Sequence, residues 1–392
     1  MHIRLSTRSI VLALCLLLIA GPEALAAGKR PKNQRNHIEV ANLNILHGVA
    51  CDPPLPGDGD QCRVRDRLDL LVQHIAAAGC PDLVTLQENV TAKFVPRTET
   101  ELVGPLDNTV ALIKKRLPAL KRSCGFAYHM VFDPAARRPP AQGRGIDEEL
   151  ILSRYPAQVR EVRPLYSPLV PFFFRHVLYA RIRHPRGPVD LFTTHLASDS
   201  DLASLPCGVN MLPPPLTSPA CPAECAAFGD TVRECQAKQV ALFVEERHDV
   251  PEPAILSGDL NAEPGSPEYL DLVGHGWIDS HLAAGNPECD PATGQNCTSG
   301  RKDNNLSDLE STALGVDERI DFIFVVPAGE GSRCAGRIRV TDHPRRPVTT
   351  TGIFAGKPNP FEPCGAAPLP VCFVSDHSGN QLNLGCGRRR AH

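Results

Sequence analysis

The sequence has no excess of positive charge. Its 41 lysines and arginines are outnumbered by 44 aspartates and glutamates, and the formal net charge is −3 with histidine neutral. A protein that coats nucleic acid through its surface charge would need the opposite balance, so that class is excluded. A site that meets a phosphate through a bound metal ion stays possible, because the ion supplies positive charge locally.

The sequence also lacks a long apolar segment after its first residues, so no later membrane-spanning helix is expected. At the start, Arg4 and Arg8 precede an apolar run from Ile10 to Ala20, and Ala24-Leu-Ala26 is a small-x-small cleavage site. The run is short for a bilayer span. Residues 1–26 are therefore expected to be a signal peptide, and the mature chain to be soluble and secreted or periplasmic.

Two alternatives exist for this first segment. A retained membrane anchor is disfavoured by the well-formed cleavage site. A lipoprotein attached through Cys15 is disfavoured because the bulky Leu14 precedes that cysteine.

Cysteine is frequent, and its use agrees with export. The chain has 15 cysteines, and removal of Cys15 with the signal peptide leaves an even number, many of them in loops rich in proline and glycine. In an exported chain this pattern indicates disulfides. Spacing does not fix their connectivity, but Cys51–Cys62 and Cys289–Cys297 are the most attractive local pairs.

A zinc site is the alternative for one group of cysteines. Cys221-Pro-Ala-Glu-Cys225 is followed by Cys235, which gives three possible thiolate ligands. The spacing is loose and no paired histidines follow, so disulfides are favoured there too.

Strands and helices alternate from residue 38 onward. Residues 27–37 form a basic lead-in that we expect to be flexible, residues 38–392 a single domain, and residues 204–230 a proline- and cysteine-rich loop insertion. Apolar spacing predicts helices near 65–78, 107–121 and 233–246. Strands are expected at 38–44, 82–87, 128–132, 149–153, 177–182, 189–194, 254–258 and 319–326, with a last pair around 371–384. This order suits a two-sheet α/β sandwich flanked by helices.

In seven short segments, an apolar run typical of a β-strand ends at a polar residue that could take part in catalysis or metal binding. They are Ile38-Glu-Val-Ala-Asn-Leu-Asn44, Asp82-Leu-Val-Thr-Leu-Gln-Glu88, Leu150-Ile-Leu-Ser-Arg-Tyr-Pro156, Leu191-Phe-Thr-Thr-His195, Ile255-Leu-Ser-Gly-Asp-Leu-Asn261, Arg319-Ile-Asp-Phe-Ile-Phe324 and Ser375-Asp-His377. Functional groups at strand ends converge on one edge of a sheet or sandwich, where loops can hold a ligand.

The order of these segments resembles the endonuclease/exonuclease/phosphatase family, the fold of deoxyribonuclease I. The resemblance runs from about residue 38 to 384. It implies a four-layer α/β sandwich in which two packed mixed sheets are flanked by helices. It also implies hydrolysis of phosphoester bonds with a divalent metal ion, Mg²⁺ or Mn²⁺, bound by hard oxygen ligands.

The same resemblance assigns the metal site. Glu88 is its first ligand, Asn44 supports the metal or the phosphate, and Asp376 is a further candidate ligand. Asn42 rivals Asn44, because alternate residues of a strand face the same side. Alone, Glu88 would be an ordinary exposed residue at a strand end.

The resemblance also assigns the catalytic groups. Asp259 orients or deprotonates the attacking water, and Asn261 donates a hydrogen bond to the phosphate. His195 contacts the phosphate or serves as general acid, and Asp321 accepts a hydrogen bond from His377. The competing interpretations are a structural histidine at 195 and a helix-capping or turn aspartate at 259. Glu148 or Glu149 is expected to orient His195.

The expected function is that of an exported metal-dependent phosphodiesterase. A nuclease is the first substrate class, ahead of a sphingomyelinase or phospholipase C activity and then a phosphoinositide phosphatase. A toxin or binding subunit that keeps the fold without turnover is the alternative outside enzymes, and no obligate protein partner is implied. The sequence shows no aromatic and basic run of the apurinic endonuclease type. Leu165–Phe174, the one candidate for an apolar membrane finger, is interpreted as a core strand and loop.

Overall fold

The structure is a computed structural model. It describes residues 37–47, 62–91, 95–96, 102–103, 107–133, 147–169, 175–185, 187–199, 202–212, 214–227, 229–299, 318–327, 338–340, 371 and 373–386. The chain from Asn36 to His392 forms one compact unit. The expected signal peptide, nearly all of the basic lead-in, Cys51 and residues 170–174 lie outside the described residues.

The first sheet has six strands in the order β13-β14-β1-β2-β6-β5. They are β1 (His37–Asn44), β2 (Leu83–Asn89), β5 (His129–Phe132), β6 (Glu148–Ser153), β13 (Ile338–Val340) and β14 (Asn380–Cys386). Among these described strands β1 and β2 pair in parallel and the other neighbours are antiparallel, so this sheet is mixed. The last segment of the chain thus contributes β14, which pairs with the first strand.

The second sheet also has six strands, in the order β11-β12-β10-β9-β8-β7. They are β7 (Ala157–Pro164), β8 (His176–Ile182), β9 (Val189–His195), β10 (Ala254–Asp259), β11 (Ile278–Asp279) and β12 (Asp321–Val326). Here β9 and β10 are the parallel pair. A short hairpin, β3 (Val95–Pro96) with β4 (Leu102–Val103), stands apart from both sheets.

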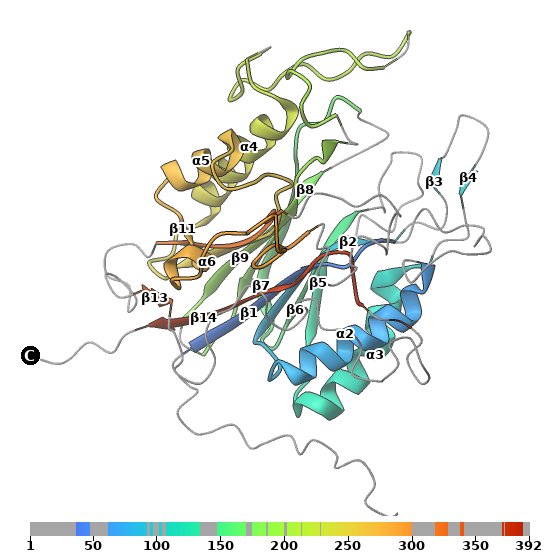
Figure 1. The fold of residues 1–392 in the computed structure, drawn as a ribbon, viewed down its shortest axis with the longest axis vertical. Helices are drawn as coiled ribbons and strands as arrows, with labels where there is room; N and C mark the ends of the chain where they lie inside the picture. Colours follow the sequence, from blue (N-terminus) through green and yellow to red (C-terminus); the bar gives the residue numbers. More distant parts are fainter. Residues whose placement is uncertain are drawn as a thin grey trace, which may run out of the picture. The chain divides into compact units, whose positions relative to one another are not determined.

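Helices cover the outer faces of the two sheets (Figure 1). The first sheet packs against α2 (Val64–Ala77) and α3 (Thr109–Cys124) through one apolar cluster. The second packs through another cluster against α4 (Val232–Arg247) and α5 (Pro267–Gly274), and the short α6 (Ser280–Ala283) follows β11. A third cluster fills the space between the sheets. The expected four-layer α/β sandwich is therefore confirmed.

Local chemistry explains where the longer helices begin and end. The Asn108 side chain accepts a hydrogen bond from the backbone N–H of Ala111 at the start of α3. A capping box between Thr231 and Glu234 begins α4. Gly125, with a φ of +75°, ends α3 in the left-handed conformation that glycine adopts without a steric penalty. No helix among the described residues is long and apolar enough to cross a membrane.

Four disulfides join described cysteines: Cys80–Cys124, Cys207–Cys221, Cys225–Cys235 and Cys289–Cys297. The last is one of the two expected local pairs. For the other, Cys62 is disulfide-bonded and Cys51 lies outside the described residues. Several disulfides of this kind are consistent with an extracytoplasmic protein.

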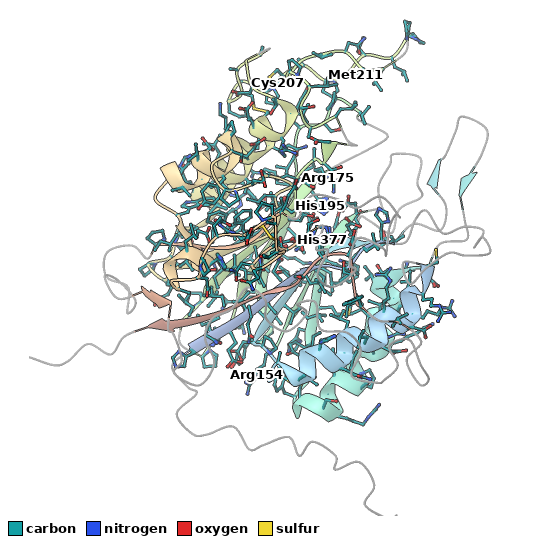
Figure 2. All side chains as sticks on the ribbon, in the orientation of Figure 1. Arg154, Arg175, His195, Cys207, Met211 and His377 are labelled. Carbon is teal, nitrogen blue, oxygen red and sulfur yellow. A yellow bond between two sulfur atoms is a disulfide. The ribbon has the colours of Figure 1, made fainter. Side chains whose placement is uncertain are left out.

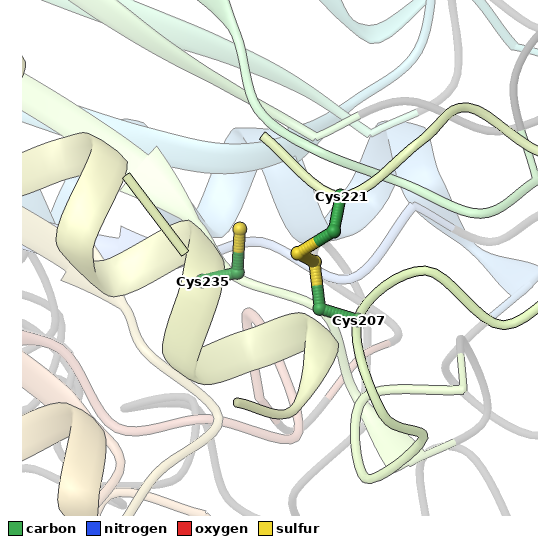
Figure 3. Close-up of side chains that lie close together, drawn as sticks. All are labelled: Cys207, Cys221 and Cys235. Atoms are coloured by element: carbon green, nitrogen blue, oxygen red, sulfur yellow. A yellow bond between two sulfur atoms is a disulfide. The ribbon is translucent and has the colours of Figure 1, made fainter. Parts of the chain in front are cut away.

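The zinc alternative fails because its sulfurs are already bonded. Cys207, Cys221 and Cys235 gather closely enough to suggest a metal site, but Cys207 and Cys221 share a disulfide (Figure 3). Cys235 is bonded to Cys225 in turn. A thiolate in a disulfide no longer serves as a zinc ligand.

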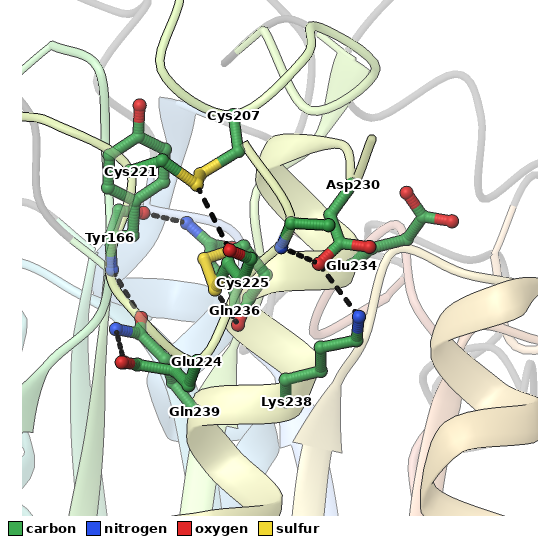
Figure 4. The surroundings of a disulfide bond; sticks show 12 residues. Tyr166, Cys207, Cys221, Glu224, Cys225, Asp230, Glu234, Gln236, Lys238 and Gln239 are labelled. Carbon is green, nitrogen blue, oxygen red and sulfur yellow. Dashed lines mark hydrogen bonds and ion pairs between the residues drawn. A yellow bond between two sulfur atoms is a disulfide. The ribbon is translucent and has the colours of Figure 1, made fainter. Parts of the chain in front are cut away.

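Polar contacts hold α4 against the segment that contains Tyr166 and against the disulfide-bonded insertion (Figure 4). Gln236 Nε2 donates to the Tyr166 carbonyl at 2.7 Å, and Gln239 Oε1 accepts from the Tyr166 backbone N–H at 2.7 Å. Lys238 pairs with Asp230 at 2.7 Å. Tyr166 is buried and belongs to the segment 165–174, which was expected to be a core strand and a loop; the described residues 165–169 form no strand.

Candidate functional site

Polar residues from both sheets meet where β1, β2, β9 and β10 end. Within the second sheet, Asp259 at the end of β10 lies beside His195 on β9 and beside Asp321, the first residue of β12. Within the first sheet, Asn44 at the end of β1 lies beside the last residues of β2. Parallel pairing brings the carboxyl ends of neighbouring strands to one edge, and Figure 2 shows His195 and His377 close together there.

Asn44 connects the two sheets at this edge. Its Nδ2 donates to Glu88 Oε1 at 2.7 Å, within its own sheet, and to Asp259 Oδ2 at 3.0 Å, across to the other sheet. Its rival Asn42 instead accepts hydrogen bonds from Thr85 and Gln87 deeper between the sheets. Asn44 is therefore the asparagine that reaches the site, and Asn42 belongs to the polar layer behind it.

Asp259 occupies the centre of the group. Its Oδ2 lies 3.4 Å from Nε2 of His195 and 3.8 Å from Nε2 of His377. The residue is 1% exposed. A buried carboxylate between two imidazoles can exchange protons or orient a water molecule.

Gly258 permits this placement by its lack of a side chain. A Cβ at this position would lie 2.0 Å from the carbonyl oxygen of Thr194 on the neighbouring strand. Only glycine allows β10 to approach β9 so closely just before the functional carboxylate.

Asn261 reaches the site through a turn. The strand ends at Asp259, and the backbone N–H of Asn261 donates to Asp259 Oδ1 at 2.8 Å. Asn261 has a φ of +47°, and its Nδ2 lies 2.8 Å from His195 Nε2. A turn, and not alternation along a strand, therefore brings Asn261 beside Asp259.

His377 and Asp321 form the expected pair. His377 Nδ1 lies 2.8 Å from Asp321 Oδ2, with both residues buried. Burial alone lowers the pKa of His377, but Asp321 and Asp376 outweigh it and raise that pKa well above its usual value. Burial raises the pKa of Asp321 to about 6, although His377 opposes the shift.

The carboxylate beside His195 is Asp147, so the expectation of Glu148 or Glu149 was wrong. His195 Nδ1 lies 2.6 Å from Asp147 Oδ1, whereas Glu149 contacts His176. Burial and Arg175 lower the pKa of His195, but Asp147 and Asp259 outweigh them and raise it to about 9. Asp147 has a φ of +65° immediately before β6, which turns its side chain toward His195 in a way that strand alternation does not predict.

Glu88 is a partly buried, ionised carboxylate in an irregular part of β2. Its φ is +59°, next to a shift of register against β6. One oxygen accepts from Asn44 and the other from the backbone N–H of His47 at 3.0 Å. Burial raises the pKa of Glu88, but His47, His195 and Asn44 outweigh it, so the net shift is downward.

Asp376, the third expected ligand, lies beside His377. It accepts a hydrogen bond from the Ser375 hydroxyl at 3.0 Å and is partly exposed. Among the described residues it shares no hydrogen bond with Glu88 or Asn44. Asp259, Asp321 and His377 form a different group, in which the potential ligand atoms all lie within 4.8 Å of one another. The described chain thus contains a buried acidic and histidine group that could bind a metal ion.

Three residues in the site were not anticipated: Asp147, Arg175 and His47. Arg175 is buried, forms an ion pair with Asp147 and lies 2.6 Å from His195 Nδ1 (Figure 2). No motif marks these residues. A backbone signal does exist, because Leu46, Glu88, Asp147 and Asn261 all adopt positive φ values. Non-glycine residues in this conformation are uncommon and gather at functional sites.

We predict that Asp147→Asn lowers the pKa of His195 below about 9, because it removes a carboxylate that stabilises the imidazolium. A histidine whose folded pKa exceeds the unfolded value of 6.5 stabilises the fold fully below about pH 6.5. That contribution is lost as the pH rises through about 9, so the variant should lose less stability across this window. NMR titration of the His195 ring and unfolding at several pH values measure both effects.

The matched control for that prediction is Glu149→Gln, which removes a buried carboxylate paired with His176. It should change the His195 titration much less. An unchanged His195 in Asp147→Asn, or an equal fall in both variants, would contradict the assignment of Asp147.

Comparison with known proteins agrees with this geometry. Residues 41–377 match the Endonuclease/Exonuclease/phosphatase family, while no curated protein sequence matches the chain significantly. Truncated TDP2 from Caenorhabditis elegans is 15% identical with a TM-score of 0.51, and the alignment covers 89% of this chain and 97% of that one. An endonuclease/exonuclease/phosphatase from Bacteroides vulgatus is 16% identical with a TM-score of 0.50, covering 90% of this chain and 99% of that one. These structures show the fold, and the family match spans most of the sequence: the chain belongs to the Endonuclease/Exonuclease/phosphatase family.

Proposed function

We propose that this chain is an exported, divalent-metal-dependent phosphodiesterase that cleaves nucleic acid. The observation that supports it most is the position of Asp259 Oδ2, 3.4 Å from one histidine Nε2 and 3.8 Å from another. The family includes phosphodiesterases and nucleases, generally hydrolyses phosphoester bonds and typically depends on a divalent metal ion. A binding subunit would have no use for the complete set of buried acids, amides and histidines that gathers here.

The proposed chemistry divides among the chain's own residues. Asp259 orients the attacking water and accepts its proton, while Asn44 keeps that carboxylate in place from the other sheet. His377, aligned by Asp321, and His195, aligned by Asp147, present positive charge and a proton to the phosphate oxygens. Such preorganised donors stabilise the charge that develops in the transition state.

The residues present fit a hard divalent cation. Glu88 is ionised and partly buried, and it lies beside the amide of Asn44. Glu88 with Asn44, and Asp376 as a further ligand, would hold Mg²⁺ or Mn²⁺, which prefer oxygen donors of this kind. When bound, the ion would neutralise phosphate charge in a chain that is acidic overall.

Export is part of the proposal. We expect a mature chain that begins near Ala27, with residues 38–392 forming one catalytic domain and residues 27–37 a basic lead-in. The disulfides between described cysteines support an oxidising compartment.

A parallel turnover assay tests the reaction and its substrate class. Plasmid DNA, RNA, sphingomyelin and an inositol phosphate are offered with Mg²⁺ to the purified, oxidised protein. We expect turnover of nucleic acid, loss of activity after exhaustive chelation, and recovery with Mg²⁺ or Mn²⁺. Full activity after verified metal removal would contradict the metal dependence, and exclusive turnover of a lipid or inositol substrate would contradict the nuclease assignment.

Glu88→Gln should raise the metal concentration needed for half-maximal activity, because a neutral amide binds a hard cation more weakly than a carboxylate does. A metal titration of turnover measures this. Glu245→Gln, on an exposed carboxylate of α4, is the control and should leave the titration unchanged. Identical titrations for wild type and Glu88→Gln would remove Glu88 from the ligands.

The pH profile of kcat/KM should be bell-shaped. Activity should rise as Asp321, with a pKa of about 6, loses its proton and becomes able to accept from His377. It should fall as His195, with a pKa of about 9, becomes neutral. In Asp147→Asn the alkaline limb should move to lower pH while the acid limb stays. A profile without an alkaline limb, or one that Asp147→Asn leaves in place, would count against His195 as the proton donor.

A further inference from the structure

Thr298 contacts Asp321 and Ser378, the residue that follows His377. It is completely buried and immediately follows Cys297, whose disulfide to Cys289 closes a short loop. Its hydroxyl oxygen accepts hydrogen bonds from the backbone N–H groups of Ile320 at 3.0 Å and Asp321 at 3.1 Å. The hydroxyl thus fixes the backbone at the point where β12 begins.

The backbone of Thr298 contacts the segment that carries His377. Its carbonyl accepts from the N–H of Ser378, the residue after His377, at 2.7 Å. Its own N–H donates to the carbonyl of Glu318 at 2.7 Å. One residue therefore connects two segments that lie far apart in the sequence and carry Asp321 and His377.

The loop that carries Thr298 is itself anchored. Arg319, which is 1% exposed, donates to Glu288 at 2.6 Å and to Asp279 at 2.8 Å. The Cys289–Cys297 disulfide closes the loop between Glu288 and Thr298. Thr298 is thus attached to a rigid support, which a residue that positions others requires.

We propose that Thr298 is a positioning residue that aligns Asp321 with His377 through its hydroxyl group. Thr298 touches no reacting atom, and it acts through the alignment of Asp321 with His377. The inference deepens the proposed function, on which its catalytic consequence rests. It also predicts a property of the folded protein that does not require turnover.

Thr298→Val and Thr298→Ser separate the hydroxyl from the packing of the side chain. Valine keeps the volume but leaves the N–H groups of Ile320 and Asp321 without their acceptor. Serine keeps the acceptor and removes only a methyl group. A residue that merely fills space would tolerate valine better than serine, whereas a positioning hydroxyl requires the reverse order.

The experiment measures kcat, KM and the ring signals of His377 in the full oxidised protein. We expect Thr298→Val to lower kcat roughly 10- to 100-fold with little change in KM, as is typical when the support of a functional group is lost. In ¹H–¹⁵N spectra of histidine-labelled protein, the Nδ1–H signal of His377 should weaken or shift. Thr298→Ser should restore both readouts to within a few-fold of wild type.

Thr231→Val is the matched control, because it removes another hydroxyl that accepts a backbone N–H, at the start of α4. It should lower stability and leave kcat and the His377 signal unchanged. Thr298→Val with a wild-type His377 signal, or Thr298→Ser as impaired as Thr298→Val, would overturn the proposal. If the wild-type protein cleaves no phosphoester, the proposed function fails, while the His377 signal still decides the role of Thr298.

Discussion

The hydrogen bond from Asn44 to Asp259 crosses from one sheet to the other, and the arrangement of the site depends on it. Asn44 ends β1, Asp259 ends β10, and their atoms lie 3.0 Å apart. Deeper between the sheets, Thr85 and Ser257 lie 2.9 Å apart and Gln87 donates to Thr193 at 2.9 Å. Buried polar groups require hydrogen-bond partners, so these cross-sheet bonds fix the position of one sheet relative to the other. Burial of the apolar core stabilises the packing of the two sheets, and the polar layer determines their alignment.

The alignment of the two sheets brings several carboxylates together at a largely buried site, where charged groups are unfavourable unless they have partners. Glu88, Asp147, Asp259 and Asp321 are all largely buried around one point, and unpaired carboxylates there would be strongly destabilising. Each has a partner among asparagines, histidines or Arg175. The carboxylates in turn raise the pKa of His195 and His377, so the interactions that make the buried acids tolerable also prepare the histidines to donate protons.

Much of the fold and site was predictable because strand ends carry their own signal. Asn44, Glu88, His195 and Asp259 all lie at the expected ends of strands, where apolar runs stop at polar residues. Strand β7 escaped detection because it lies at a sheet edge and none of its residues is buried, so it gives no clear apolar alternation. Helix α5 is eight residues long, too short for a clear helical period.

The remaining site residues could not be predicted for a different reason. Asp147 depends on a left-handed backbone that turns it away from the pattern of the following strand. Thr298 acts through hydrogen bonds to backbone groups distant in sequence, which leave no residue pattern. Arg175 precedes β8 and is defined by the acid and histidine it meets in space. These are tertiary relationships, and local sequence does not encode them.

The most direct test of the account is a double-mutant cycle on turnover with Asn44→Ala and Asp259→Ala. If Asp259 handles the attacking water and Asn44 holds it in place, Asp259→Ala should lower kcat by at least about 10²-fold in a folded protein. Adding Asn44→Ala should then cost little more, because the two residues act as a unit. A folded Asp259→Ala variant with near wild-type turnover, or losses that simply multiply in the double mutant, would contradict the central role of this cross-sheet contact.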